Sequence, residues 1–291
     1  MDRCPSVKYD LLGVGKLNFD IVKAPEGRAT YVGGSVPNTI SDAARLGLRT
    51  SLIARVGKDR EGSASLKELL RRGVDISHMM IDESPTSTCE ITITETRDRV
   101  YTTPPSKWTA YDRSRHSAVV KDSRAVFVTR GVIGFGDCAE DCDVSGVFWA
   151  SVLQSPIDAN STGIKNLVQH PPQLLFGNEE EAAIGKRAVE AVLSNGGTVV
   201  ITLGGRGCKV MSGSTEKRYG SFETKMLDAT GAGDAFAAGY LFGILRGFDE
   251  ERTATVANAC GALAVAEKGP VAELTWRRVE NFLSERELNK P

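Results

Sequence analysis

The feature that most restricts the fold of this 291-residue chain is a repeated alternation of short apolar runs with helical patterns. Residues 9–15 form an apolar run that ends in glycine, and a helical periodicity begins after Gly33-Gly34 and closes at Gly47. A strand at 51–56, a charged helix at 61–72 and a strand at 76–81 continue the pattern. Strands that alternate with helices indicate an α/β fold with a largely parallel sheet.

Further apolar runs in the second half of the chain extend this sheet. We predict strands at 125–129, 152–157, 173–176 and 197–203, and a polar meander at 209–212 and 216–219. Helical patterns follow at about 231–246, 249–266 and 275–287. Residues 131–146 are rich in Gly, Asp and Cys without a clear period, so we assign them no structure.

Two segments interrupt the alternation. Residues 21–32 hold Pro25 and Gly27, which suits a short excursion from the main sheet, and the threonine-rich runs at 86–94 and 100–103 predict a hairpin. We expect residues of about 19–32 and 86–104 to form a small β-layer over a cleft, which acts as a lid. An antiparallel edge on the main sheet explains the hairpin equally well.

Composition excludes several classes of protein. Lys+Arg 36 against Asp+Glu 37 gives a net charge of -1, which predicts no nucleic-acid partner and no anionic membrane surface. No apolar run approaches the roughly 20 residues that span a bilayer, and residues 1–8 lack an apolar signal region. The six scattered cysteines predict reduced thiols. We therefore expect a cytoplasmic protein with a local anion site.

One glycine-rich turn, Asp228-Ala229-Thr230-Gly231-Ala232-Gly233-Asp234, directly precedes the apolar helix of residues 235–245. The unpaired N–H groups at a helix start, together with the helix dipole, favour an anion such as phosphate. A carboxylate at that place is either an N-cap or a base that takes a proton from a hydroxyl being phosphorylated. The local spacing does not choose between these two roles of Asp234.

Polar residues also follow other predicted strands. Asn18 and Asp20 come after the first strand, where ligands bind in open parallel sheets, unless they belong to an ordinary turn. Asn178 and Glu181 lie one helical turn apart after the strand at 173–176, where they either cap the helix or help to hold hydrated Mg²⁺. A glycine loop follows Thr202, and no Walker A motif exists. These are the parts that phosphoryl transfer needs.

The motifs occur in the order found in one family. Gly33-Gly34, with Asn38 and the run 43–47, resembles the N-terminal motif of the ribokinase-like (pfkB) carbohydrate kinases, and residues 228–234 resemble their C-terminal motif. The resemblance covers nearly the whole chain. It implies one kinase domain, residues 1–291, with a ribokinase-like three-layer αβα sandwich, a largely parallel central sheet and a small β-lid. Residues 33–37 differ from the form associated with ribokinase, so the substrate stays open.

The resemblance also implies a role for each matching residue. The expected substrate-binding residues are Asn18, Asp20, Gly33, Gly34 and Asn38. The expected nucleotide-binding residues are Thr202, Gly204 and Gly207, to which we add Asn258. Asn178 and Glu181 match the family's Mg²⁺ and phosphate network. The role of base falls on Asp234, in a catalytic anion hole with Gly231, Ala232 and Gly233.

The implied function is that of an ATP- and Mg²⁺-dependent kinase that phosphorylates a hydroxyl of a small sugar-like substrate. A nucleoside kinase is the alternative, in which Phe19, Tyr31 and Trp108 line a slot for the base. A non-catalytic sugar or nucleotide sensor is a further alternative. A monovalent cation activates some family members. The edges of the lid offer a surface for a homodimer, unless the charged residues 97–99 prevent such pairing.

Overall fold

The computed structural model describes residues 7–24, 27–93, 99–102, 104, 109–154, 158–267, 269 and 273–288. Within these ranges the main sheet has nine strands in the order β15-β14-β13-β12-β11-β10-β1-β4-β6. In chain order these strands are β1 (Tyr9–Val14), β4 (Thr50–Ile53), β6 (Val74–Asp75), β10 (Ser123–Thr129), β11 (Phe148–Val152), β12 (Leu174–Asn178), β13 (Thr198–Thr202), β14 (Cys208–Ser212) and β15 (Thr215–Tyr219).

The strands from β13 to β6 are parallel, and only β14 and β15 are antiparallel to their neighbours. In the centre of the sheet, Val14 pairs with Val128 on one side and with Ile53 on the other. The carboxyl ends of the parallel strands therefore meet along one edge. The predicted α/β class with a largely parallel sheet is confirmed.

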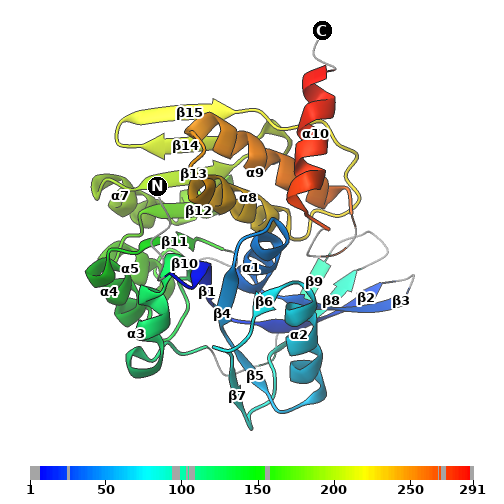
Figure 1. Cartoon of the computed structure of the whole chain (residues 1–291), viewed down its shortest axis with the longest axis vertical. Coiled ribbons are helices and arrows are strands. Elements are labelled where there is room, and N and C mark those ends of the chain that lie inside the picture. Colours follow the sequence, from blue (N-terminus) through cyan, green and yellow to red (C-terminus); the bar gives the residue numbers. More distant parts are fainter. Residues whose placement is uncertain are drawn as a thin grey trace.

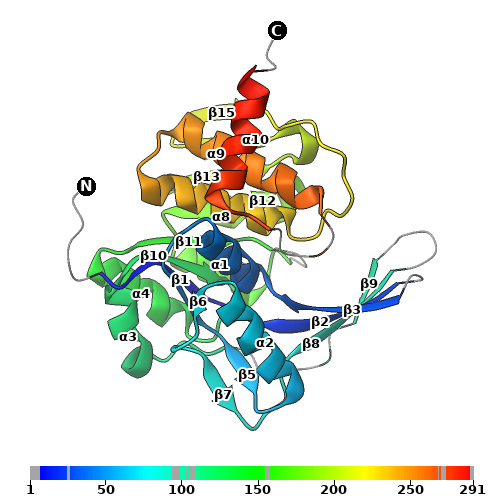
Figure 2. The same ribbon diagram turned by 45° about the vertical axis from the view of Figure 1, so that its right-hand side comes forward.

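Helices cover both faces of this sheet, as Figures 1 and 2 show. One face packs against helices that include α1, α8 and α9, and the other against α3, α4, α5 and α7. Leu11 belongs to the first core and its neighbour Leu12 to the second, because successive side chains of a strand point to opposite faces. The helices are α1 (Ser35–Arg45), α2 (Arg60–Arg71), α3 (Arg113–Lys121), α4 (Phe135–Ser145), α5 (Thr162–Gln169), α6 (Glu179–Ile184), α7 (Lys186–Ser194), α8 (Ala232–Arg246), α9 (Glu250–Val265) and α10 (Trp276–Leu288).

A second sheet projects from the body of the molecule beside α2 (Figure 2). Its order is β3-β2-β8-β9, and its strands are β2 (Asn18–Ala24), β3 (Gly27–Gly33), β8 (Thr88–Ile93) and β9 (Arg99–Thr102). These strands come from the two segments in which the sequence predicts a β-layer. The alternative, a hairpin on the edge of the main sheet, is wrong because β8 pairs with β2 and β9.

Several elements differ from the prediction in their boundaries, and some helices were not predicted. The strand predicted at 152–157 is β11, which ends at Val152, and Gln154 turns the chain away with a φ of 52°. Of the strand predicted at 76–81, only Met80 and Ile81 lie in a strand, β7 (Met80–Asp82), which pairs with β5 (Arg55–Gly57), and residues 76–79 form the turn between β6 and β7. Residues 131–146 contain α4, whose Cys138 and Cys142 face the core. Helices α3, α5 and α7 had no prediction.

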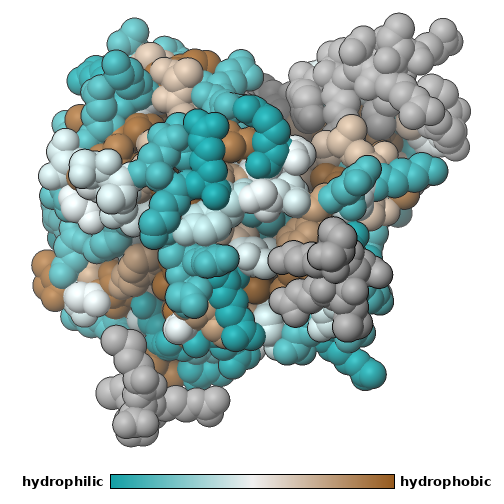
Figure 3. Space-filling view, turned by 90° about the horizontal axis from the view of Figure 1, so that it is seen from above, coloured by the Kyte–Doolittle hydropathy of each residue, from teal (hydrophilic) through white to brown (hydrophobic). Residues whose placement is uncertain are grey.

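None of the helices in the described ranges is long and apolar enough to cross a membrane. On the face seen in Figure 3, hydrophilic residues predominate and hydrophobic residues lie in separate patches between them.

Candidate active site

The predicted site residues gather at the carboxyl edge of the main sheet. Asn178 and Thr202 end adjacent strands and are register partners. Asn18 and Asp20 follow β1 through the turn into β2. The helix α1 begins immediately after β3, and its first residues reach α8. The fold thus brings together segments that are almost 200 residues apart in the chain.

Asp234, in the first turn of α8, is held by two side chains from the start of α1. Ser35 Oγ donates to Asp234 Oδ1 at 2.7 Å, and Asn38 Nδ2 donates to Oδ2 at 2.9 Å. Thr39 Oγ1 donates to the carbonyl oxygen of Asp234 at 3.3 Å. Asp234 does not cap its own helix, since Gly231 is the N-cap and makes no side-chain bond. Its carboxylate is therefore held in place by α1.

The start of α8 has the geometry of an anion site. Gly231 has a φ of 76°, a left-handed conformation that favours glycine. The first N–H groups of a helix have no intrahelical acceptor, and this helix start has no side-chain cap to occupy them. The amide of Ala232 donates to the carbonyl of Ala229 at 3.3 Å. The amides of Gly233 and Asp234 are therefore the better donors to a phosphate.

Two carboxyl groups of the site have raised pKa values. Burial raises the pKa of Asp234 from 3.8 to about 6, against the hydrogen bonds from Ser35 and Asn38, which lower it. Burial, and then the charge of Asp234, raises the pKa of Asp20 to about 7. The effect of Asp234 on Asp20 requires the two carboxyl groups to lie near each other. Groups with pKa values near neutrality are suited to proton transfer.

The Gly33-Gly34 turn places Asp20 and leaves no room for a larger residue. A Cβ atom on Gly33 would lie 1.9 Å from Asp20 Oδ2, so the carboxylate rests on the glycine. Gly34 has a φ of 107°, and a Cβ there would lie 2.4 Å from the carbonyl oxygen of Lys16. Asn18 pairs with Gly33, and its buried Oδ1 has no partner among the described residues. A polar ligand would satisfy that acceptor.

Asn178 and Glu181 form a capping box at the start of α6. Asn178 Oδ1 accepts from the Glu181 amide at 2.8 Å, and Glu181 Oε2 accepts from the Asn178 amide at 3.0 Å. The capping interpretation of these residues is therefore correct for this structure. Glu181 is buried, and its charge acts on the pKa values of Asp234 and Arg130.

The same pair fits a hydrated Mg²⁺ ion only as part of its shell. The described residues contain no cluster of three or more His, Cys, Asp or Glu side chains that would hold a metal alone. Mg²⁺ in nucleotide sites keeps several waters and binds one or two carboxylates together with phosphate oxygens. One amide and one carboxylate are enough for that arrangement.

The loop after β13 is shaped by glycine. Gly204 and Gly207 have φ values of 59° and 90°, and the Leu203 amide donates to the Gly207 carbonyl at 2.7 Å. A Cβ on Gly207 would lie 2.0 Å from the carbonyl oxygen of Tyr219. Asn258 of α9 contacts the residue that follows this loop, since its Nδ2 donates to Cys208 Sγ at 3.5 Å. The predicted nucleotide residues thus lie close together.

Sequence reasoning missed one direct partner of Asp234 and one buried carboxyl. Ser35 follows Gly33-Gly34 at the first position of α1, and nothing in its local pattern indicates a partner 199 residues away. Asp42 is fully buried in α1, although its residue type predicts a solvent-exposed position. Asn38, Thr39 and Ser41 of the same helix are polar as well, so the local sequence does not set Asp42 apart.

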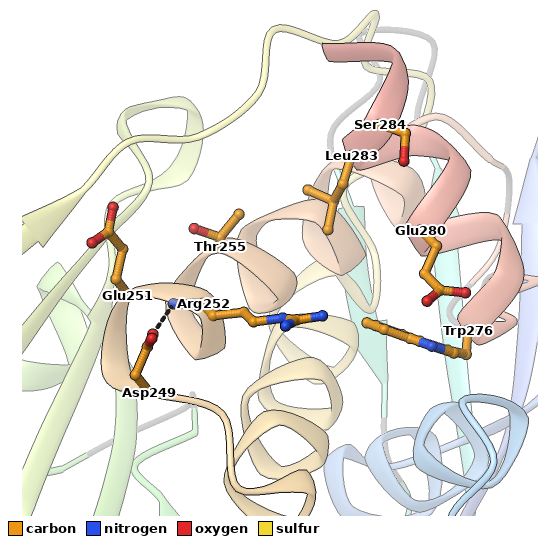
Figure 4. A pocket seen from close by; sticks show the side chains of 8 residues that line it. All are labelled: Asp249, Glu251, Arg252, Thr255, Trp276, Glu280, Leu283 and Ser284. Carbon is orange, nitrogen blue, oxygen red and sulfur yellow. Dashed lines mark hydrogen bonds between the residues drawn. The ribbon is translucent and has the colours of Figure 1, made fainter. Parts of the chain in front are cut away.

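A separate hollow lies between the start of α9 and α10 (Figure 4). Arg252 and Trp276 face each other across it, and Asp249 accepts from the Arg252 amide at 2.8 Å as the N-cap of α9. None of the predicted site residues lines this hollow.

Comparisons with known proteins agree with the geometry. Residues 6–277 match the sequence profile described as pfkB family carbohydrate kinase. A nucleoside kinase of Methanothermobacter thermautotrophicus is 28% identical over 95% of this chain and 96% of its own. A 2-dehydro-3-deoxygluconokinase of Thermoproteus tenax is 27% identical over 82% of this chain and 81% of its own. The structure of a ribokinase-like protein from Escherichia coli, in complex with ATP and Mg²⁺, superposes with a TM-score of 0.83 at 20% identity and covers 95% of this chain and 99% of that one.

Proposed function

The chain belongs to the pfkB family of carbohydrate kinases and is a phosphotransferase with an alcohol group as acceptor, and from this premise we propose that Asp234 is its general base. The ribokinase-like fold expected from the motifs is confirmed by the structural comparison. We propose that the acceptor is a small sugar-like molecule that lies between Asp20 and Asp234.

The proposed reaction needs one proton acceptor and one anion site. Asp234 takes the proton from the acceptor hydroxyl as its oxygen bonds to the γ-phosphorus, and the bond from phosphorus to the ADP oxygen breaks. The amides of Gly233 and Asp234 lie at the start of α8, where the helix dipole stabilises negative charge on the transferring group. Acceptor and phosphate then approach the same helix end from opposite sides.

One observation carries this proposal. The carboxylate of Asp234 is fixed by Ser35 and Asn38 from α1, while the helix start that it belongs to has no side-chain cap. A residue that served only as a cap would bond to its own helix. The arrangement instead leaves the amides open for a phosphate and holds the carboxylate beside them.

ATP is expected to occupy the edge formed by the Thr202–Gly207 loop, with Asn258 close to it. Mg²⁺ would be held by the nucleotide phosphates, water and the Asn178–Glu181 pair, and when bound it neutralises charge on the β- and γ-phosphates. We propose that the second sheet acts as a lid that excludes water from the acceptor. Its residues Asp20 and Tyr31 are register partners, so a movement of the sheet moves both.

A nucleoside acceptor is the second candidate, because a relative named as a nucleoside kinase matches 95% of the chain. Tyr31 is half-buried and pairs with Asp20, so it lies on the same face of the second sheet and would offer a surface for a base. Phe19 pairs with Val32 and lies on the opposite face, so it does not line the predicted slot beside Asp20. Trp108, the third residue of the predicted slot, lies outside the described residues.

The proposal is tested by measuring ADP release with a panel of sugars, sugar acids and nucleosides. Replacing Asp234 by Asn should lower kcat by roughly 10²–10⁴-fold with nucleotide binding retained. Asp249→Asn, which changes an N-cap at the start of the next helix, is the matched control and should keep wild-type kcat. Unchanged kcat in Asp234→Asn would refute the assignment of the base, and no acceptor-dependent ADP release would favour a sensor.

We also propose a cytoplasmic location and, through the edges of the second sheet, a homodimer. Light scattering measures the mass in solution, and a monomer would refute the dimer. The dependence of kcat on K⁺ tests whether a monovalent cation is needed.

A further inference from the structure

Asp42 is a carboxyl group of α1 that the proposed mechanism does not use. Its exposed fraction is 0%, and neither of its oxygens has a hydrogen-bond partner within the described part of the chain. An unpaired buried carboxylate is strongly unfavourable, and such a group takes up a proton instead. Burial is the first cause that raises the pKa of Asp42 well above its ordinary value. In its neutral form the group has one O–H donor that needs an acceptor.

Asn38 supplies an acceptor one helical turn earlier. Its Nδ2 donates to Asp234 Oδ2 at 2.9 Å, whereas its buried Oδ1 has no partner among the described residues. Residues four apart on a helix lie on the same face, where Asn and Asp side chains hydrogen-bond to each other. An unsatisfied Oδ1 costs free energy and leaves the amide free to turn, so that either end could face Asp234.

We propose that Asp42, as a neutral carboxylic acid, is a positioning residue that donates a hydrogen bond to Asn38 Oδ1 and so fixes the amide that holds the base Asp234. The chain of contacts runs from Asp42 O–H to Asn38 Oδ1 and from Asn38 Nδ2 to Asp234 Oδ2. This inference rests on the proposed role of Asp234. Asp42 touches neither acceptor nor nucleotide, and acts through Asn38.

Charged and titratable groups from several elements act on Asp42. The charges of Asp234 at the start of α8 and of Glu267 after α9 raise its pKa, and those of Arg45 and Arg72 lower it. Burial raises the pKa of the Cys260 thiol in α9, and a negative charge on Asp42 would raise that pKa further.

Both arginines have carboxylate partners elsewhere. Arg72 pairs with Glu68 at 2.6 Å, and Arg45 with Glu273. Arg45 Nε is itself buried without a partner among the residues described. A charged Asp42 turned toward that nitrogen is the arrangement that the experiment must exclude.

Infrared difference spectroscopy tests the protonation state without any substrate. The spectrum of the wild type minus that of Asp42→Asn, both recorded near neutral pH, should show the carbonyl band of one carboxylic acid. The subtraction cancels the signals of Asp20 and Asp234, which both proteins share. A carboxylate band in its place would overturn the proposal. This result does not depend on kinase activity. A failure of the proposal for Asp42 can therefore be distinguished from a failure of the proposed kinase function.

Kinetics then test the positioning role. Asp42→Asn keeps a donor of the same shape, whereas Asp42→Leu removes it without adding a charge. We expect Asp42→Leu to lower kcat by roughly threefold to tenfold, as one lost hydrogen bond implies, with KM for ATP unchanged. Asp42→Asn should keep most of the wild-type rate. We also expect the kcat of the wild type to fall at alkaline pH as Asp42 loses its proton, and Asp42→Asn should lack this fall.

Two kinetic results would refute the positioning role. One is equal kcat in the Asn and Leu variants, and the other is an alkaline limb that persists in Asp42→Asn. If the Leu variant does not fold, the comparison of pH profiles between wild type and Asp42→Asn decides alone.

Discussion

Removing the charge of Asp234 should stabilise the fold at neutral pH while it removes the proposed base. The pKa of this carboxyl rises from 3.8 to about 6 in the folded protein, chiefly through burial. Between these pH values the folded protein binds more protons than the unfolded chain, so its stability falls as the pH rises through that window. Below about pH 4 the group is protonated in both states and makes no difference.

The size of the effect follows from the shift. A rise from 3.8 to about 6 is a difference of about 2 pKa units, which corresponds to about 3 kcal/mol above pH 6. Because Asp234 is only partly buried, water screens its charge, and we expect Asp234→Asn to gain about 1–3 kcal/mol. The oxygen of the new side-chain amide can accept from Ser35. Its N–H₂ group can donate to Asn38 Oδ1 once the Asn38 side-chain amide rotates by half a turn.

Urea unfolding of wild type and Asp234→Asn at pH 4, 5, 6, 7 and 8 measures the gain. The difference in the free energy of unfolding should grow between pH 4 and pH 6 and then stay constant. Glu68→Gln is a control of opposite sign, since hydrogen bonds from Arg71 lower the pKa of Glu68 from 4.5 to about 2. That variant should be less stable than wild type at pH 7. A stability difference for Asp234→Asn that is equal at pH 4 and pH 7 would refute the reasoning.

Three further predictions concern the groups around the base. Gly33→Ala should raise KM for the acceptor about tenfold or more without changing KM for ATP, because its Cβ would displace Asp20. The control variant Gly220→Ala, whose Cβ would meet open space, should change neither KM. Ser35→Ala removes a hydrogen bond that lowers the pKa of the base, so the acid limb of the kcat–pH profile should move to higher pH, and an unmoved limb would contradict that account. Asn178→Ala breaks the capping box and should cost about 1 kcal/mol in urea unfolding; a raised half-saturation for Mg²⁺ in the same variant would support the metal role, and an unchanged one would count against it.

The sequence predicts the α/β class well because strand and helix periods are local properties. The glycine turn at 228–234 and the turn at Gly33-Gly34 could be predicted for the same reason. The contact that joins them was not, since Ser35 and Asn38 meet Asp234 only through the packing of α1 on α8. The helix α4 escaped prediction because its Gly, Asp and Cys residues have low helix propensity, and burial of Cys138 and Cys142 outweighs that propensity.

The electrostatics of the site agree with the proposed catalytic role of Asp234. Asp20, Asp42 and Asp234 all have pKa values raised chiefly by burial, so each carboxyl destabilises the folded protein at neutral pH. An amide in place of Asp234 would keep the shape and the hydrogen bond from Ser35, and a site that only binds a sugar would lose little by the exchange. A proton acceptor cannot be an amide. In the proposed mechanism, the carboxylate kept at Asp234 supplies, at a cost in stability, the proton acceptor that phosphoryl transfer from ATP to a hydroxyl requires.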